Sequence, residues 1–192
     1  PIELLPFDFK EFLRGKNFVI DPKYSSLPEE RGKLLRLLDE YLTNGGFPEV
    51  VVNKLDPKNY LGTLYDALLL KDVIKRHKVK FSSQIGNLGS NLINNFANQY
   101  SLRKLQKALD FKSVATTEKY TKYLEEAYLI FSLMSYSSKS IARIKSPRKA
   151  YVVDNGFITA KAVQYSPDNG KLMENLIFIE LVKRGYEPNR EL

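Results

Sequence analysis

Apolar residues recur at helical spacing through most of the first hundred residues, and this periodicity predicts a mostly helical chain. In "SSLPEERGKLLRLLDEYLTNGGFPEV", leucines and a tyrosine repeat at i, i+3, i+4, i+7 and i+8, the pattern of one buried helix face. Ser26 and Glu29 have the spacing of a capping box, and Asn44-Gly45 supplies a left-handed stop. Further helices are predicted after a cap at Asp8, from Asp56-Pro57 to about Arg76, and from Ser82 or Ser83 onward.

The pattern changes at Ser101. "SLRKLQKALDF" predicts a short helix, and after a tight turn a second helix begins at Thr116 or Thr117. "YLIFSLMSY" and "IARIKSPRKAYVVD" then predict two strands of a hairpin around "SSKS". Helix, turn, helix and hairpin together predict a winged helix. On its second helix we expect Tyr120, Tyr123, Leu124, Ala127 and Tyr128 to face inward, and Glu118, Lys119, Thr121, Lys122 and Glu125 to face outward.

Positive charge is concentrated in the same segment. The net charge is +8, and Ser101 to Lys149 holds 11 Lys or Arg against 4 Asp or Glu, or +7 of that excess. Such an uneven distribution favours a polyanion partner such as DNA, the alternative being a basic solvated face without a partner. The candidate nucleic-acid-binding residues are Arg103, Lys104, Lys107, Lys119, Lys122, Lys139, Arg143, Lys145, Arg148 and Lys149.

The second helix of the winged helix is nearly charge-balanced and lacks an Arg or Asn at its start, the residues best suited to base edges. We therefore expect contacts with phosphates, mainly from the hairpin and the preceding helix, rather than sequence readout. Winged helices also dock proteins, so a protein-interaction module is the alternative. The earlier basic stretch "KDVIKRHKVK" ends a helix, where cations complement the helix dipole, and this accounts for about half of that cluster.

Composition excludes several kinds of site. No run of 18 uncharged apolar residues and no signal peptide pattern occur, so no membrane partner is expected. Cysteine is absent, which rules out disulfides and thiolate metal sites and fits the reducing cytoplasm. The single histidine, His77, is expected at the surface rather than as a metal ligand. Gly45-Gly46 lacks the Lys and Ser or Thr of a phosphate loop and is predicted to be a cap and turn.

Six phrases in chain order carry a resemblance to a known family: "IELLPFDFKEFL", "YLTNGGFPEV", "LKDVIKR", "TTEKYTKYLEEAYLIF", "KAYVVDNGFITA" and "GKLMENLIFIELVKRG". Over essentially all 192 residues the chain resembles the C-terminal portion of a large uncharacterised family of archaeal and bacterial AAA-type ATPases. The resemblance implies a linker after a missing ATPase core over 1–25, a helical region over 26–100, a winged helix over 101–150, and the start of an α/β domain similar to PD-(D/E)xK nucleases over 151–192. The expected fold class is mostly α with a small β component.

The resemblance also singles out one carboxylate. "MENLIFIELVKRG" matches the first helix of the family's nuclease-like domain, and Glu174 matches its acidic residue. Apolar residues nearly surround this helix and imply burial, so the acid would need a partner, a metal or a raised pKa. Glu174 is expected as a catalytic residue and Mg²⁺ ligand only in the intact protein, because the chain stops before the next acidic motif; a local cap or ion pair is the alternative. Asp154 is expected in a turn.

The leading functional prediction is the nucleic-acid-binding or regulatory C-terminal part of a cytoplasmic ATPase. One alternative is a module that senses a protein partner and regulates the missing ATPase domain, and another is a Mg²⁺-dependent nuclease in the intact protein. No cofactor is expected on this chain, whereas ATP and Mg²⁺ are expected for the full-length parent. The start at Pro1 and the end at "EPNREL" indicate a piece of a longer protein.

Overall fold

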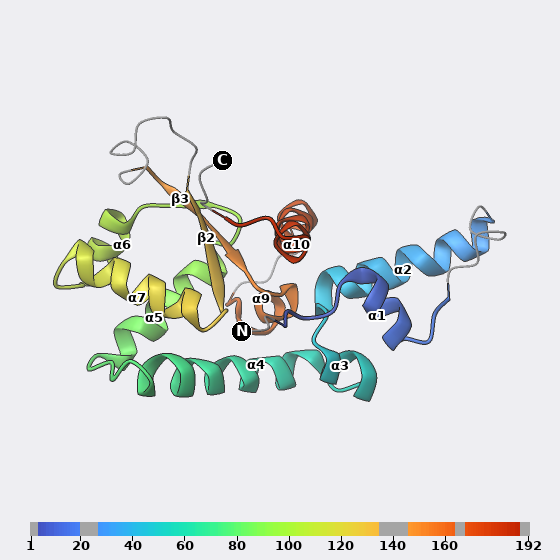
Figure 1. Ribbon diagram of the computed structural model, residues 1–192, viewed down its shortest axis with the longest axis horizontal. Coiled ribbons are helices and arrows are strands. Elements are labelled where there is room, and N and C mark those ends of the chain that lie inside the picture. Colours follow the sequence, from blue (N-terminus) through green and yellow to red (C-terminus); the bar gives the residue numbers. More distant parts are fainter. Residues whose placement is uncertain (1–3, 20–26, 135–145, 164–167, 189–192) are drawn as a thin grey trace.

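The computed structural model describes residues 4–19, 27–134, 146–163 and 168–188. The chain is mostly helical with a small three-stranded antiparallel sheet (Figure 1), which confirms the predicted mixture of mostly α with small β. Within these ranges no helix combines the length and the apolar character needed to cross a membrane. The elements are α1 (Phe9–Gly15), α2 (Pro28–Asn44), α3 (Pro48–Asn53), α4 (Pro57–Leu68), η1 (Leu69–Lys75), α5 (Ser82–Asn94), β1 (Gln99–Tyr100), α6 (Leu102–Ala108), α7 (Val114–Glu126), β2 (Ile130–Met134), β3 (Arg148–Val152), α9 (Asn155–Lys161) and α10 (Asn169–Lys183).

Helix boundaries follow local capping chemistry. Asp8 and Glu11 form a reciprocal capping box at the start of α1, each carboxylate accepting the other residue's backbone N–H at 2.8 Å. The Asp56 carboxylate caps α4 with one hydrogen bond, accepted from the backbone N–H of Asn59 at 2.8 Å. The predicted stop of α2 is confirmed, because Gly45 follows Asn44 with a φ of 77°, a conformation that favours glycine. The predicted capping box of α2 depends on Ser26, which lies outside the described residues.

The helix predicted from Asp56 to Arg76 changes its geometry halfway. From Leu69 to Lys75 it continues as the π-helix η1, whose wider turns are rare and recur at functional sites. Val73 within η1 is fully buried, so the wider turn is packed into the core. The chain then turns at Lys78, which has a φ of 51°, and reaches α5 four residues later.

The sheet has β3 in the middle, flanked by β1 and β2. Both neighbours are antiparallel to β3, with Ile130 opposite Val152 and Met134 opposite Arg148 at the two ends of the β2–β3 pairing. The predicted pairing of two antiparallel strands is confirmed for these residues, and 135–145 lie outside the described ranges. The short strand β1 was not predicted, since two residues leave no periodic signal.

Helix α7 starts and faces somewhat differently from the prediction. The Ser113 hydroxyl accepts the backbone N–H of Thr116 at 3.1 Å, so the helix begins at Val114 rather than at Thr116 or Thr117. Thr121 was expected to face outward but is fully buried, and its hydroxyl donates to the Thr117 carbonyl at 2.9 Å. Tyr128 was expected inward but is 41% exposed just after the helix ends.

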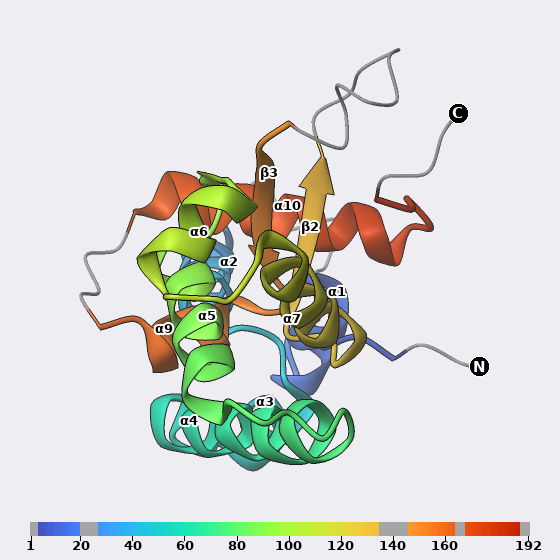
Figure 2. The same cartoon turned by 90° about the vertical axis from the view of Figure 1, so that its left-hand side faces the viewer.

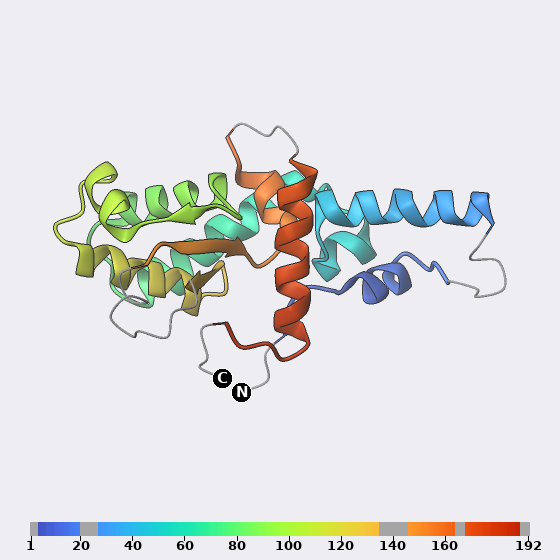
Figure 3. The ribbon, with the colours of Figure 1, turned by 90° about the horizontal axis from the view of Figure 1, so that it is seen from above.

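The buried apolar residues of the described chain form one large cluster and two smaller ones. The largest cluster extends from Leu42 on α2 to Leu172 on α10, so it continues across the boundaries expected near residues 100 and 150. Seen from above, α10 crosses the middle of the molecule, with α1–α3 to one side and the sheet with α5–α7 to the other (Figure 3). Helix α4 and η1 run beneath the sheet and α5–α7 toward α3 (Figure 1), and α4 packs against α9. Contacts of α10 with α2, β3 and α9 join the two ends of the described chain.

Candidate functional site

Five of the ten cations predicted to bind nucleic acid are exposed on α6 and α7, and none of them forms an ion pair within the described residues. Figures 1 and 2 place these two helices side by side at the end of the molecule opposite α2, and they are in contact. The five are Arg103, Lys104 and Lys107 on α6, and Lys119 and Lys122 on α7. Three more of the ten, Lys139, Arg143 and Lys145, lie outside the described residues.

The other two predicted cations are neutralised by carboxylates. Arg148 is 8% exposed, and its Nη2 lies 2.6 Å from Glu118 Oε1. The ammonium of Lys149 lies 2.5 Å from Glu174 Oε1. Burial alone would lower the pKa of Arg148, but the ion pair with Glu118 outweighs it and raises the pKa. In this structure Arg148 and Lys149 are thus each paired with a carboxylate, whereas unpaired cations were expected. Their contact with phosphates stays a prediction.

One cation of α6 and one of β3 lie close together, but a carboxylate beside them leaves little net positive charge. Arg103 and Arg148 line one open depression of about 530 Å³ together with Glu118. Because Glu118 compensates Arg148, Arg103 supplies the uncompensated charge among these three side chains. The expected convergence of hairpin and helix is present here in a weakened form.

Glu174 lies at the protein surface. Its side chain is 41% exposed and accepts hydrogen bonds from the Tyr151 hydroxyl at 2.8 Å and from Lys149. Partial burial would raise the pKa of Glu174, but these two hydrogen bonds outweigh it and lower the pKa. The expected burial was wrong because α10 leaves Ile177 and Leu181 about half exposed. The local ion pair, which was the alternative for Glu174, is what the structure shows, and the described ranges contain no group of three or more His, Asp or Glu side chains that could hold a metal.

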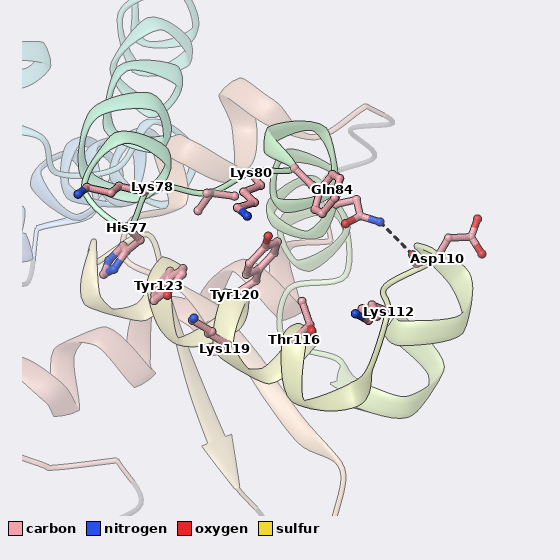
Figure 4. A pocket seen from close by; sticks show the side chains of 12 residues that line it. His77, Lys78, Lys80, Gln84, Asp110, Lys112, Thr116, Lys119, Tyr120 and Tyr123 are labelled. Carbon is pink, nitrogen blue, oxygen red and sulfur yellow. Dashed lines mark hydrogen bonds between the residues drawn. The ribbon is translucent and has the colours of Figure 1, made fainter.

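A second basic region forms another open depression, which we call the lysine pocket (Figure 4). It has a volume of about 510 Å³ and lies between the turn after η1, the start of α5, and α7 with the loop before it. Four lysines line it, and none forms an ion pair within the part of the chain that the structure describes. They are Lys78, Lys80, Lys112 and Lys119.

Only one carboxylate residue, Asp110, contributes to the described wall of the lysine pocket. In Figure 4 its carboxylate points away from the other labelled side chains. Its backbone carbonyl accepts a hydrogen bond of 2.9 Å from the Gln84 amide, which connects α5 to the loop before α7. The pocket therefore carries a positive charge that its own wall does not compensate.

Stacked rings form one end of the pocket. The rings of His77 and Tyr123 lie parallel, with centroids 3.7 Å apart and 10° between planes, and the Lys119 ammonium lies 5.7 Å from the Tyr123 centroid. His77 Nε2 is 3.3 Å from Glu126 Oε2, a contact that becomes an ion pair when the imidazole is protonated. His77 was expected at the surface and is instead partly buried against Tyr123.

Sequence reasoning missed the lysine pocket for two reasons. Lys78 and Lys80 belong to "KDVIKRHKVK", whose charge was assigned partly to a helix dipole, and they precede the segment in which charge was counted. Lys112 and Lys119 belong to that segment but lie more than 30 residues further along the chain, beyond α5, β1 and α6. Packing of α5 and η1 against α7 brings the two pairs of lysines together. The sequence feature that could have indicated the pocket is the scarcity of acidic residues both in "KDVIKRHKVK" and after Ser101.

A buried polar cluster joins two turns far apart in the chain. The Asp154 carboxylate accepts the backbone N–H of Gly46 and that of Gly156, both at 2.8 Å. Burial raises the pKa of Asp154 to about 6, although both hydrogen bonds oppose the rise. Asp154 was expected in a turn, but Asn155-Gly156 begin α9 and Asp154 is the N-cap of that helix. The bond to Gly46 adds a long-range contact.

Two buried asparagines extend this cluster to α10. The Asn175 side chain accepts the backbone N–H of Val152 and donates to its carbonyl, both at 2.8 Å, and also donates to Asn155 Oδ1 at 2.9 Å. The Asn155 amide donates to the carbonyls of Leu42 and Leu172. These groups satisfy one another and hold β3, α2 and α10 in register, so their role is structural.

Two curated proteins are similar to nearly all of this chain. "Uncharacterized protein MJ1544" of Methanocaldococcus jannaschii is 36% identical over 196 aligned positions, which cover 99% of this chain and 43% of that protein. An "Uncharacterized protein" of Haemophilus influenzae is 29% identical over 191 positions, covering 96% of this chain and 45% of that protein. The chain thus spans less than half the length of either relative, and no solved structure matches it. Residues 35–167, more than half of the chain, match the family described as "Domain of unknown function (DUF8612)", and the chain belongs to that family.

Proposed function

We propose that this chain is the nucleic-acid-binding, regulatory C-terminal part of an AAA-type ATPase. The observation that carries the proposal is a group of cations that form no ion pair within the described residues, gathered around α6, α7 and the lysine pocket. Because self-repulsion disfavours such a group, a bound polyanion would stabilise it. The group consists of Lys78, Lys80, Arg103, Lys104, Lys107, Lys112, Lys119 and Lys122.

The order of elements supports a winged-helix reading of this region. Helix α5, strand β1, helices α6 and α7, and strands β2 and β3 follow one another, and the sheet order is β1-β3-β2. In this reading α6 and α7 form the helix-turn-helix, with α5 as the helix before it. Lys119 and Lys122 on α7 would then contact phosphates, which suits binding without sequence readout.

The ATPase assignment rests on the family resemblance of the sequence. Both curated relatives are more than twice as long as the matched region, which leaves room in them for another domain. ATP and Mg²⁺ would bind in that other domain. The ion pair with Lys149 accounts for Glu174 without a metal, so our proposal assigns it no cleavage. Nucleic-acid cleavage by the intact protein that is lost in Glu174→Gln would restore the nuclease alternative.

Salt-dependent DNA binding tests the proposal. Fluorescence anisotropy with a labelled oligonucleotide should show affinity falling steeply and log-linearly with salt between 50 and 200 mM, by roughly 10³-fold or more if about six phosphates are contacted. Reversing Lys80, Lys112 and Lys119 to Glu should weaken binding by at least about 100-fold and reduce the salt slope by about 3. A second variant, in which Arg103, Lys104 and Lys107 are changed to Glu, measures how much α6 contributes to the affinity for DNA.

The matched control reverses three exposed cations at the other end of the molecule, Arg31, Arg36 and Lys58, which changes the net charge equally. It should lose affinity far less than either test variant. Equal losses in all three variants would mean that only the overall charge matters. Affinity independent of salt would reject the proposal.

One observation favours a protein partner as the second candidate function. Ile177 and Leu181 are 53% and 46% exposed on α10 and, with Phe9, line an open groove of about 620 Å³. Exposed apolar residues around one groove are a feature of protein-docking sites. Ile177→Asp with Leu181→Asp should then change the ATPase rate of the full-length protein and leave DNA binding intact. Under the leading proposal, reversing the pocket lysines should instead weaken DNA binding and leave the ATPase rate without DNA unchanged.

A further inference from the structure

We propose that the lysine pocket takes an unpaired nucleotide, so that the protein prefers single-stranded to double-stranded nucleic acid. This inference rests on the proposed nucleic-acid binding and specifies its substrate class. Three features of the pocket support it: its recessed shape, one free aromatic ring, and the polar groups around that ring.

The shape favours a single nucleotide. At about 510 Å³ the recess falls in the size range of small-molecule sites, roughly 300–1,000 Å³. The bases of a duplex are paired and stacked inside the helix, so only their backbones could reach the rim. An unpaired base can leave its stack and enter a recess, as in single-strand recognition generally.

Phe81 offers the ring on which a base could stack. It is 61% exposed at the pocket wall and stacks on no other ring in the described part of the chain. The other three aromatic rings of the wall are already engaged, since Tyr123 and His77 stack on each other and Tyr120 packs edge-on against Phe111. A large exposed ring next to uncompensated lysines combines the two parts of a single-strand site, a stacking platform and a cationic track.

Hydrogen-bonding groups lie beside the lysines. In Figure 4 the Tyr120 hydroxyl points toward Lys80, and Thr116 lies between Lys119 and Lys112. The Tyr120 hydroxyl makes no hydrogen bond within the described residues and is free to bind a ligand. Lysines suit the phosphate as point charges, and hydroxyls suit either the phosphate or polar base edges.

The test compares a labelled single-stranded oligothymidine with a duplex carrying the same number of phosphates, both at the same salt. We expect the single strand to bind at least about tenfold more tightly. Phe81→Ala should weaken single-strand binding about 5- to 100-fold, the range for loss of one base–aromatic stack. Its salt slope should stay unchanged, because no charge is removed, and duplex affinity should change less than twofold. Phe81→Tyr should restore single-strand affinity.

Leu70→Ala is the control, since Leu70 is 47% exposed on η1 and does not line the pocket. It should leave both affinities unchanged, and unfolding curves verify that each variant folds. Equal affinity for the two substrates, or unaltered single-strand binding in Phe81→Ala, overturns this inference. If binding then still depends on salt and on the pocket lysines, the proposed function survives. If neither the single strand nor the duplex binds, the proposed function and this inference both fail.

Discussion

The Asp154 carboxylate accepts a hydrogen bond of 2.8 Å from the backbone N–H of Gly46, which lies 108 residues earlier in the chain. This bond brings the turn at Gly45-Gly46 into direct contact with the first turn of α9, which contains Gly156. A Cβ built on Gly45 would lie 1.7 Å from Asp154 Oδ1, and one on Gly156 would lie 2.4 Å from the Asn44 carbonyl oxygen. Neither turn can accept a side chain unless the other moves.

Gly45→Ala should therefore destabilise the fold strongly. Gly45 has a φ of 77° and a ψ of −167°, a region essentially restricted to glycine, and the added methyl would overlap the Asp154 carboxylate. We expect the free energy of unfolding to fall by about 3 kcal/mol or more in urea titrations. Gly32→Ala is the control, because Gly32 lies within α2 with open space around its Cα, and it should stabilise by about 0.5–1 kcal/mol. Similar stabilities of the two variants would contradict this account.

Stability should depend on pH through Asp154. Burial raises the pKa of this carboxyl to about 6 from an ordinary value of 3.8, so the folded state holds the proton more tightly than the unfolded state. Its contribution to stability is thus fully present below about pH 4 and is lost as the pH rises through 6. The size of this loss is about 3 kcal/mol. Asp154→Asn should abolish this component, so the difference in unfolding free energy between wild type and variant should change between pH 4 and 6. A constant difference across that range would refute the assignment.

Asn175 and Glu174 are neighbours on α10 that should respond very differently to substitution. Asn175→Ala removes three hydrogen bonds and leaves the Val152 backbone N–H and carbonyl buried without partners, so we expect a loss of about 3–5 kcal/mol. Glu174→Gln breaks an exposed ion pair and should cost about 1 kcal/mol or less. Thermal and urea unfolding measure both. A larger effect at Glu174 than at Asn175 would show that the carboxylate matters more than its surface pairing implies.

Glu118→Gln separates a stability effect from a binding effect. It leaves the Arg148 guanidinium nearly buried without its carboxylate, which should lower the unfolding free energy by about 1–3 kcal/mol. If DNA binds at this end of the molecule, the same change should tighten binding about three- to tenfold, because Arg148 and Arg103 line one depression. Glu49→Gln on α3 alters the net charge equally and should do neither. Weaker DNA binding by Glu118→Gln would argue against a phosphate near Arg148.

Local chemistry made much of the fold predictable. The caps at Asp8 and Asp56 and the stop at Gly45 act within a few residues, so the sequence shows them directly. The change from α4 to η1 and the burial of Thr121 depend on what packs against these helices, and no residue pattern in either helix signals it. Apolar residues around α10 indicated burial, yet the helix crosses the molecule with one side exposed at Ile177 and Leu181.

The candidate site was only partly predictable, because charge can be counted along the chain but pairing occurs in space. The cations of α6 are exposed, as their density suggested. Arg148 and Lys149 lie in an equally basic stretch of the sequence, but Glu118 on α7 and Glu174 on α10 pair with them. Lys78 and Lys80 fall before the basic segment and meet Lys112 and Lys119 only after α5 and η1 pack against α7.

The bond between Asp154 and Gly46 has a consequence for how the protein is made. A ribosome must synthesise and release the chain beyond residue 156 before the turn at Gly45-Gly46 can find its partner, and beyond Asn175 before β3 is tied to α10. Contacts of such long sequence separation form late and slowly. The apolar faces that α2 and α4 turn toward α9 and α10 therefore stay uncovered during translation until those later helices have been made.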